Sequence, residues 1–113
     1  MRVYGIVNCS TVKAARTWLE SQRKSYEFVD FRKVPPTRDQ LAEWCKAFGW
    51  ERVLNRRGTT WRMLPPAAQA RVKDEASAIA LMLEKPTVIK RPVVEAGPTT
   101  LIGFDQDEYL ARL

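Results

Sequence analysis

The chain has 113 residues, which is the length of one domain with its own hydrophobic core. Apolar residues make up 45% of the sequence and charged residues 28%, so a disordered or fibrous protein is excluded. No run approaches the roughly 18 apolar residues of a membrane span, and the N-terminus lacks the pattern of a signal peptide. The formal net charge of +6 favours anionic ligands or acidic partners without choosing among them.

The two cysteines of the sequence, Cys9 and Cys45, are not spaced as a metal site or a CxxC motif. The sequence contains no histidine, so zinc sites and histidine-based triads lack their usual residues, and no metal is expected. This cysteine usage fits a reduced, cytoplasmic setting better than an oxidising one.

The first third of the sequence predicts a strand, a helix and a second strand. Residues 2–7 are β-branched and aromatic, which is typical of a buried strand. Ser10 or Thr11 is expected to cap the helix that follows, and residues 26–31 predict the second strand. The side chains expected to share the core face of this helix are Val12, Ala15, Trp18 and Leu19.

The middle of the sequence is helical throughout. Thr37 is expected to cap a helix over residues 38–48. A short helical turn, a basic loop around Gly58 and an irregular piece follow. Residues 66–84 predict two further helical pieces, and Pro86 ends this region.

The last part of the sequence returns to strands. Residues 86–104 predict a β-hairpin that is broken at 97–98, and residues 105–113 predict a short helix with acidic residues in its first turn. The order β-α-β, helices, β-β-α is typical of an α/β sheet with an all-helical insert. We place this insert at about 35–86, within a single domain of residues 1–113.

Cys9 lies where the first strand ends and the first helix begins. Unpaired N–H groups and the positive end of the helix dipole stabilise a thiolate there, and the thiolate is the nucleophile. Side chains lean toward the helix N-terminus, so Lys13 adds a cation on the same side. A buried cysteine that only packs is the alternative. Cys45 shares a helix face with Leu41 and Trp44, and we expect it to pack in the core.

Five motifs follow one another along the whole chain: NCSTVKAARTWL, PPTRDQL, LNRRGTTWR, IKRPVV and LIGF. This series resembles the arsenate reductase (ArsC) family, and specifically its YffB and Spx-like branch. The resemblance implies a thioredoxin-like fold with a mixed four-stranded sheet and a helical insert. It also implies that Cys9 is the nucleophile, that Lys13 is the basic residue of the motif, and that Arg91 belongs to the active site and precedes a cis proline, Pro92. By residue type alone, an arginine such as Arg91 is more often a solvent-exposed charge than a ligand-binding group.

Departures from the arsenate reductases bear on the substrate. Gly5, Asn55 and Gly103 stand where enteric members have a histidine and two arginines, although Arg56 and Arg57 adjoin the loop position. Arsenate reduction is therefore the less expected activity.

The motifs together predict a thiol oxidoreductase that depends on glutathione as co-substrate and has no bound cofactor. The Cys9 thiolate would attack a disulfide or mixed disulfide, and glutathione would resolve the adduct. Lys13 would lower the pKa of the cysteine, while arginines would bind glutathionyl carboxylates. For Arg56 and Arg57, a basic surface loop is an equal alternative. The substrate-binding residues that we predict are Asn8, Ser10, Thr11, Asn55, Arg56, Arg57 and Pro92, and the predicted catalytic residues are Cys9, Lys13 and Arg91.

The main alternative is a binding module. An Spx-like regulator would dock its basic surface on an acidic protein partner such as RNA polymerase. Spx regulators usually carry a second cysteine where this chain has Val12, so an intramolecular CxxC switch is excluded while docking is not. Neither membrane association nor direct nucleic-acid binding is expected, because no DNA-binding motif appears and basic residues alternate with acidic ones.

Overall fold

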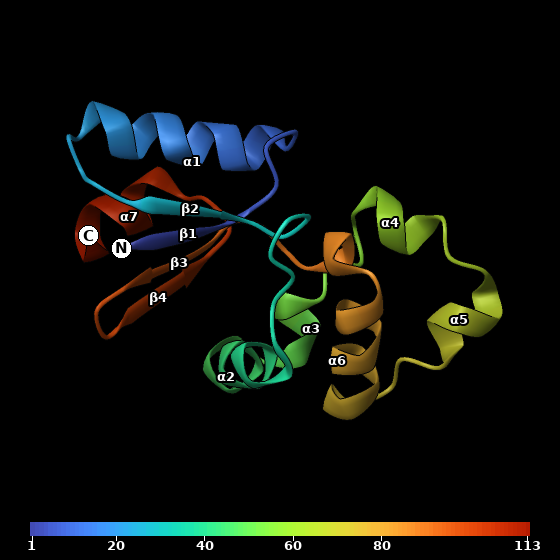
Figure 1. Cartoon of the computed structure of the whole chain (residues 1–113). Coiled ribbons are helices and arrows are strands. Elements are labelled where there is room, and N and C mark those ends of the chain that lie inside the picture. The colour runs from blue at the N-terminus through green and yellow to red at the C-terminus, as the bar shows by residue number, and fades with distance from the viewer. The chain divides into compact units, whose positions relative to one another are not determined.

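The computed structural model describes residues 1–113, which form two compact units. One unit comprises residues 1–34 together with 91–113, and the other comprises residues 35–90. The elements of the first unit are β1 (Arg2–Gly5), α1 (Ser10–Ser21), β2 (Glu27–Asp30), β3 (Val93–Ala96), β4 (Thr99–Ile102) and α7 (Gln106–Arg112) (Figure 1). Those of the second unit are α2 (Arg38–Phe48), α3 (Trp50–Val53), α4 (Thr59–Arg62), α5 (Pro66–Ala70), α6 (Glu75–Glu84) and the 3-10 helix η1 (Pro86–Val88).

The first unit is built on a four-stranded sheet in the order β2-β1-β3-β4. Strand β1 pairs in parallel with β2 and antiparallel with β3, and β3 pairs antiparallel with β4. In this register Val3 lies opposite Phe28 on one side and Val94 on the other. The mixed sheet confirms the expected fold class.

Helices α1 and α7 cover the same face of this sheet. Their side chains Leu19 and Tyr109 pack with Val3, Val94 and Leu101 in one core cluster. Aromatic rings also pack in this core cluster, because Tyr109 makes edge contacts with both Trp18 and Phe104. The expected core face of α1 is confirmed, since the buried residues of the helix are Val12, Ala15, Trp18 and Leu19.

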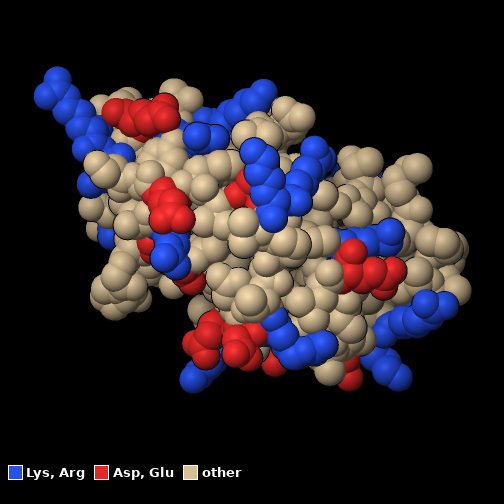
Figure 2. Space-filling model, in the orientation of Figure 1, with Lys and Arg blue, Asp and Glu red and all other residues tan.

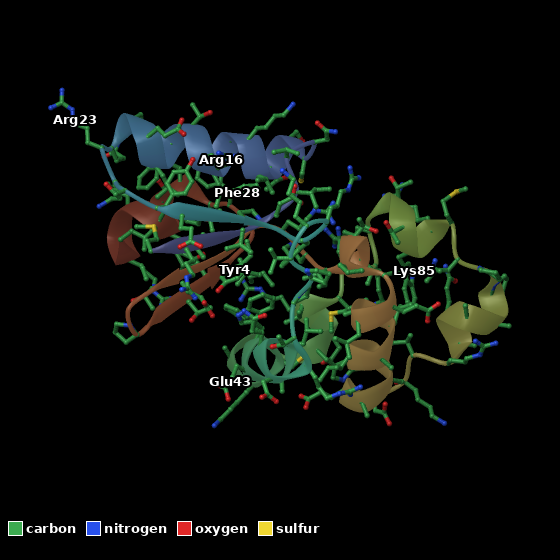
Figure 3. The ribbon with its side chains drawn as sticks, viewed as in Figure 1. Tyr4, Arg16, Arg23, Phe28, Glu43 and Lys85 are labelled. Atoms are coloured by element: carbon green, nitrogen blue, oxygen red, sulfur yellow. The ribbon has the colours of Figure 1, made fainter.

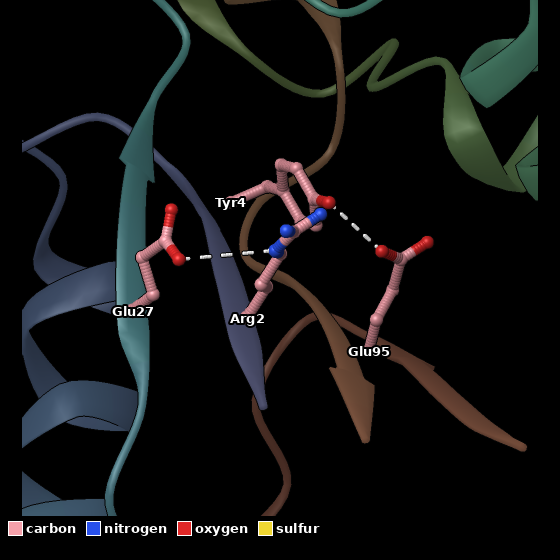
Figure 4. A network of polar contacts seen from close by, with 4 residues as sticks. All are labelled: Arg2, Tyr4, Glu27 and Glu95. Carbon is pink, nitrogen blue, oxygen red and sulfur yellow. Dashed lines mark hydrogen bonds and ion pairs between the residues drawn. The ribbon is translucent and has the colours of Figure 1, made fainter. Parts of the chain in front are cut away.

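The opposite face of the sheet carries polar side chains on neighbouring strands (Figure 4). The Tyr4 hydroxyl donates to Oε1 of Glu95 across β1 and β3 at 2.8 Å. Arg2 pairs with Glu27 across β1 and β2 at 3.9 Å. The alternation along β1 thus places Val3 in the core and its two neighbours on the polar face.

The second unit consists of helices, as the sequence predicts for the middle of the chain. Helix α2 has the expected cap at Thr37. The Thr37 hydroxyl accepts from the Gln40 N–H at 3.1 Å, and Oε1 of Gln40 accepts from the Thr37 N–H at 2.9 Å. Cys45 is 3% exposed and shares a buried face with Leu41 and Trp44, which confirms its packing role.

Three differences from the prediction exceed one residue at the end of an element. Strand β1 ends at Gly5 rather than residue 7, and the piece expected to be irregular contains the helical turn α4. The hairpin strands begin only at Val93, because the preceding segment starts with η1 and contains two prolines, which lack the N–H that a strand ladder needs. None of the helices combines the length and the apolar character of a membrane span.

Candidate functional site

Cys9 is the N-cap residue of helix α1, and this corrects the expected cap at Ser10 or Thr11. Cys9 has extended backbone angles, φ −119° and ψ 123°, while Ser10 is already helical. The Lys13 N–H donates to the Cys9 carbonyl at 2.9 Å, which closes the first turn. The Cys9 side chain therefore occupies the position from which a cap normally meets the first free N–H groups of a helix.

Gly5 brings the start of α1 close to the sheet. A Cβ atom at Gly5 would lie 2.8 Å from Cγ2 of Val12, which is closer than side chains pack. Any side chain at this position would therefore require Val12 to move. The glycine therefore has a packing role next to Cys9.

The pKa of the Cys9 thiol is lowered by groups at the helix start. Burial raises this pKa, but the backbone N–H of Val12, the guanidinium of Arg91 and the backbone N–H of Thr11 together outweigh it. The neutral Cys9 thiol makes no side-chain cap hydrogen bond at the helix start. The two N–H groups and the guanidinium therefore stabilise mainly the thiolate form of Cys9. Arg91 thus supplies the cation beside Cys9. The Lys13 side chain is exposed, and its contribution stays a prediction.

Arg91 is held in place by the start of β3. The peptide bond between Arg91 and the buried Pro92 is cis. The Pro92 carbonyl accepts from the N–H of Gly103 at 2.8 Å, and the Gly103 carbonyl accepts from the Tyr109 hydroxyl at 2.6 Å. Gly103 is buried with φ 75°, a left-handed conformation that favours glycine. This glycine therefore stabilises the link between β4 and α7.

Asn55, Arg56 and Arg57 lie in the second unit, on the loop between α3 and α4. They line a pocket of about 420 Å³ together with Glu51, Arg52, Leu54 and Lys90. Asn55 shapes this loop, because its Oδ1 accepts from the Arg57 N–H at 3.1 Å.

The predicted site residues thus fall into two groups. Those of the first unit are Asn8, Cys9, Ser10, Thr11, Lys13, Arg91 and Pro92, and those of the second are Asn55, Arg56 and Arg57. Sequence reasoning missed Arg52 and Lys90 in the second group. The sequence could have indicated both residues, because Lys90 stands in the IKRPVV motif and Arg52 lies four residues before Arg56. No group of three His, Cys, Asp or Glu side chains that could hold a metal ion occurs.

The first unit has the thioredoxin-like arrangement, in which a helix beginning at a cysteine follows the central β1 strand and a cis proline precedes β3. A family model described as the ArsC family matches residues 4–112, and the chain belongs to the ArsC family.

Similar proteins support the expected branch of this family. A solved structure named YffB is 50% identical, has a TM-score of 0.92, and is matched over 97% of this chain and 96% of that chain. An uncharacterised protein of Haemophilus influenzae is 38% identical over 109 residues, covering 96% of this chain and 95% of that protein. The global transcriptional regulator Spx of Streptococcus agalactiae is 24% identical over 108 residues, covering 94% of this chain and 77% of that regulator. The YffB and Spx-like resemblance is thereby confirmed.

Proposed function

We propose that this protein is a cytoplasmic thiol oxidoreductase that uses Cys9 as its single nucleophile and glutathione as co-substrate. The observation that carries the proposal is the lowered pKa of Cys9 at the start of α1, beside Arg91. A lowered pKa increases the thiolate fraction at neutral pH, and the thiolate is the species that attacks disulfides.

The reaction has two exchange steps. The Cys9 thiolate attacks the glutathionyl sulfur of a mixed disulfide, forms a disulfide with glutathione, and releases the substrate thiolate, which takes up a proton. A second glutathione thiolate attacks the glutathionyl sulfur of this adduct, regenerates the Cys9 thiolate, and leaves as glutathione disulfide. The substrate mixed disulfide is reduced to a thiol, and one glutathione thiol is oxidised as it joins the glutathionyl group of the substrate in glutathione disulfide.

The groups around Cys9 favour both steps. The Val12 and Thr11 N–H groups and the Arg91 guanidinium stabilise the thiolate as the attacking group and again as the leaving group. We also propose that Arg91, Arg56 and Arg57 bind the carboxylates of a glutathionyl group.

An external thiol is needed because Cys45 is unsuited to resolve the adduct. Burial, with Glu75 and Glu51 nearby, raises the pKa of Cys45 to about 11, so it is protonated at neutral pH. Its 3% exposure also denies access to a mixed disulfide. The cycle that we propose is therefore a monothiol cycle.

Arsenate reduction is not the activity that we favour. Gly5 and Gly103 stand at two positions that the arsenate reductases use, and both have packing or backbone roles here. Asn55 stands at the third and organises its own loop.

The test is the pH dependence of Cys9 alkylation by iodoacetamide in Cys45→Ser, with and without glutathione disulfide, followed by turnover of a glutathionylated peptide. We expect a midpoint below that of a free cysteine, formation of a glutathione adduct on Cys9, and turnover that Cys9→Ser abolishes. A midpoint at the value of free cysteine, or equal turnover by Cys9→Ser, contradicts the proposal.

The second candidate is a regulatory module that docks on RNA polymerase. It is supported by the relative named as the global transcriptional regulator Spx and by the cationic pocket of the second unit. On the face that Figure 2 shows, Lys and Arg are interspersed with Asp and Glu, which favours a protein partner over nucleic acid. The discriminating measurement is binding of purified RNA polymerase to Cys9→Ser by interferometry. Docking predicts unchanged affinity in this variant, and no binding by either protein contradicts it.

A further inference from the structure

The pocket of the second unit, which we call the insert pocket, concentrates positive charge. Its wall contains four cationic side chains and one carboxylate, that of Glu51. None of the four cations, Arg52, Arg56, Arg57 and Lys90, forms an ion pair within 4 Å. Like charges gathered around one cavity repel each other, and a bound anion relieves this repulsion.

Two of these cations are held by aromatic rings before any ligand arrives. The Arg52 guanidinium lies over the Phe48 ring at 5.4 Å from its centroid, and that of Arg56 lies over the Trp50 ring at 5.6 Å. A cation–π contact narrows the rotamers that an arginine occupies. Less side-chain entropy is then lost when the arginine binds a ligand.

The loop that carries Arg56 and Arg57 is also fixed. The Asn55 side chain accepts from the Arg57 N–H, and the Arg62 side chain donates to the Arg57 carbonyl. Gly58 permits a close approach, since a Cβ atom there would lie 2.8 Å from Nδ2 of Asn55. The backbone on both sides of Arg57 is therefore braced by side chains of the same segment.

Lys90 reaches the same pocket because its segment is bonded to the end of α3. The Lys90 N–H donates to the Val53 carbonyl and the Asn55 N–H donates to the Val88 carbonyl, both at 2.8 Å. Between these bonds Leu54 forms an antiparallel bridge with Ile89. Two segments distant in sequence are thus joined, and the pocket is a built site rather than a chance grouping of surface charges.

We propose that the insert pocket binds a small oxyanion that carries two or more negative charges on carboxylate or phosphate groups. Guanidinium groups match the paired oxygens of both groups, and several cations favour a multivalent ligand over a monovalent one. A volume of about 420 Å³ is the size of a small-molecule site. Because Arg56 and Arg57 are also the residues that we propose for glutathionyl carboxylates, this inference deepens and rests on the proposed function, but anion binding in the insert pocket does not itself require Cys9.

The test is an NMR titration of the ¹⁵N-labelled Cys9→Ser variant with citrate and with pyrophosphate, at constant ionic strength, and with acetate as the monovalent reference. We expect saturable shifts at residues 51–58 and 88–90, with an affinity for at least one multivalent anion about tenfold or more above that for acetate. Saturation by citrate alone identifies a carboxylate site, and saturation by pyrophosphate alone a phosphate site. Shifts that grow linearly, or that spread equally over cations of both units, overturn the proposal.

Matched variants locate the binding. Arg57→Gln removes one exposed guanidinium and should weaken binding about tenfold, whereas Lys85→Gln, outside the insert pocket at the end of α6, should leave the affinity unchanged. Gly58→Ala keeps every charge but disturbs the Asn55 contact, so it should also weaken binding while the remaining amide shifts report an intact fold. Equal affinities for Arg57→Gln and Lys85→Gln overturn the proposal.

Discussion

Gly5 of β1 and Val12 of α1 approach so closely that a methyl group on Gly5 would lie 2.8 Å from Cγ2 of Val12. We therefore expect Gly5→Ala to reduce the free energy of unfolding by about 1–3 kcal/mol, through overpacking. Urea unfolding of the wild type and the variant measures this change. Because Cys9 caps α1, the alkylation rate of Cys9 should also change.

A double-mutant cycle separates this clash from a general effect of alanine. Val12→Ala alone leaves a cavity, but it removes the atoms that a new methyl group on Gly5 would meet. The double variant should thus be more stable than the sum of the two single changes predicts. Strict additivity would show that the two positions do not contact each other.

Arg91 is the cation that lowers the pKa of Cys9, together with the helix-start N–H groups. Arg91→Gln should raise the pKa of Cys9 toward its ordinary value and slow its alkylation at neutral pH. The midpoint of the pH–rate profile with iodoacetamide measures this shift. Lys13→Gln is the matched comparison. Since Lys13 is exposed and its charge is screened by water, we expect a smaller rise. An equal or larger rise in Lys13→Gln would make Lys13 the dominant cation.

Cys45 should resist modification in the folded protein. Burial raises the pKa of Cys45 to about 11, and the side chain is 3% exposed. An aromatic disulfide reagent at pH 8 should therefore titrate one thiol in the native protein and two in denaturant. Rapid reaction of both thiols in the native protein would contradict this burial.

The same raised pKa of Cys45 makes stability depend on pH. In the unfolded chain the thiol ionises near its ordinary value of 9.0, while the folded state holds the proton until about pH 11. The stabilisation is complete below pH 9 and is lost as the pH rises toward 11. In a Cys9→Ser background, the stability difference between Cys45 and Cys45→Ala should therefore shrink from pH 8 to pH 10.5. A stability difference that stays constant over this pH range would contradict the raised pKa of Cys45.

Helix α1 ends with a non-glycine residue in a left-handed conformation. Arg23 has φ 56°, and the Lys24 N–H donates to the Leu19 carbonyl while the Arg23 N–H donates to that of Glu20. This is the Schellman arrangement, which glycine favours at that position, and the Arg23 side chain extends away from the protein at the end of α1 (Figure 3). Arg23→Gly should raise the free energy of unfolding by about 0.5–1 kcal/mol.

The adjacent position supplies the control. Gln22 has φ −88°, which needs no glycine, so Gln22→Gly should lower stability by a similar amount. Thermal unfolding of both variants measures the opposite signs. The same sign for both would show that the left-handed conformation of Arg23 carries no strain.

The class and order of most elements follow from the sequence alone, because periodicity and capping are local properties. The buried face of α1, the Thr37 cap and the packing of Cys45 could each be predicted from residues within one or two helical turns. The cap of α1 could not, because Cys9, Ser10 and Thr11 are all compatible with a helix start in sequence. The backbone angles that distinguish them depend on how β1 leads into the helix.

The tertiary structure alone decided which distant residues meet. Residue spacing offers no reason why Arg91 should lie beside a sulfur in the first ten residues, and before the structure only family resemblance linked the two. The pairing of β1 with β3 brings Arg91 there. In the same way, the bonds between residues 53–55 and 88–90 place Lys90 at the insert pocket. Local sequence patterns determine which element a residue belongs to, but strand register and long-range hydrogen bonds determine what that residue touches.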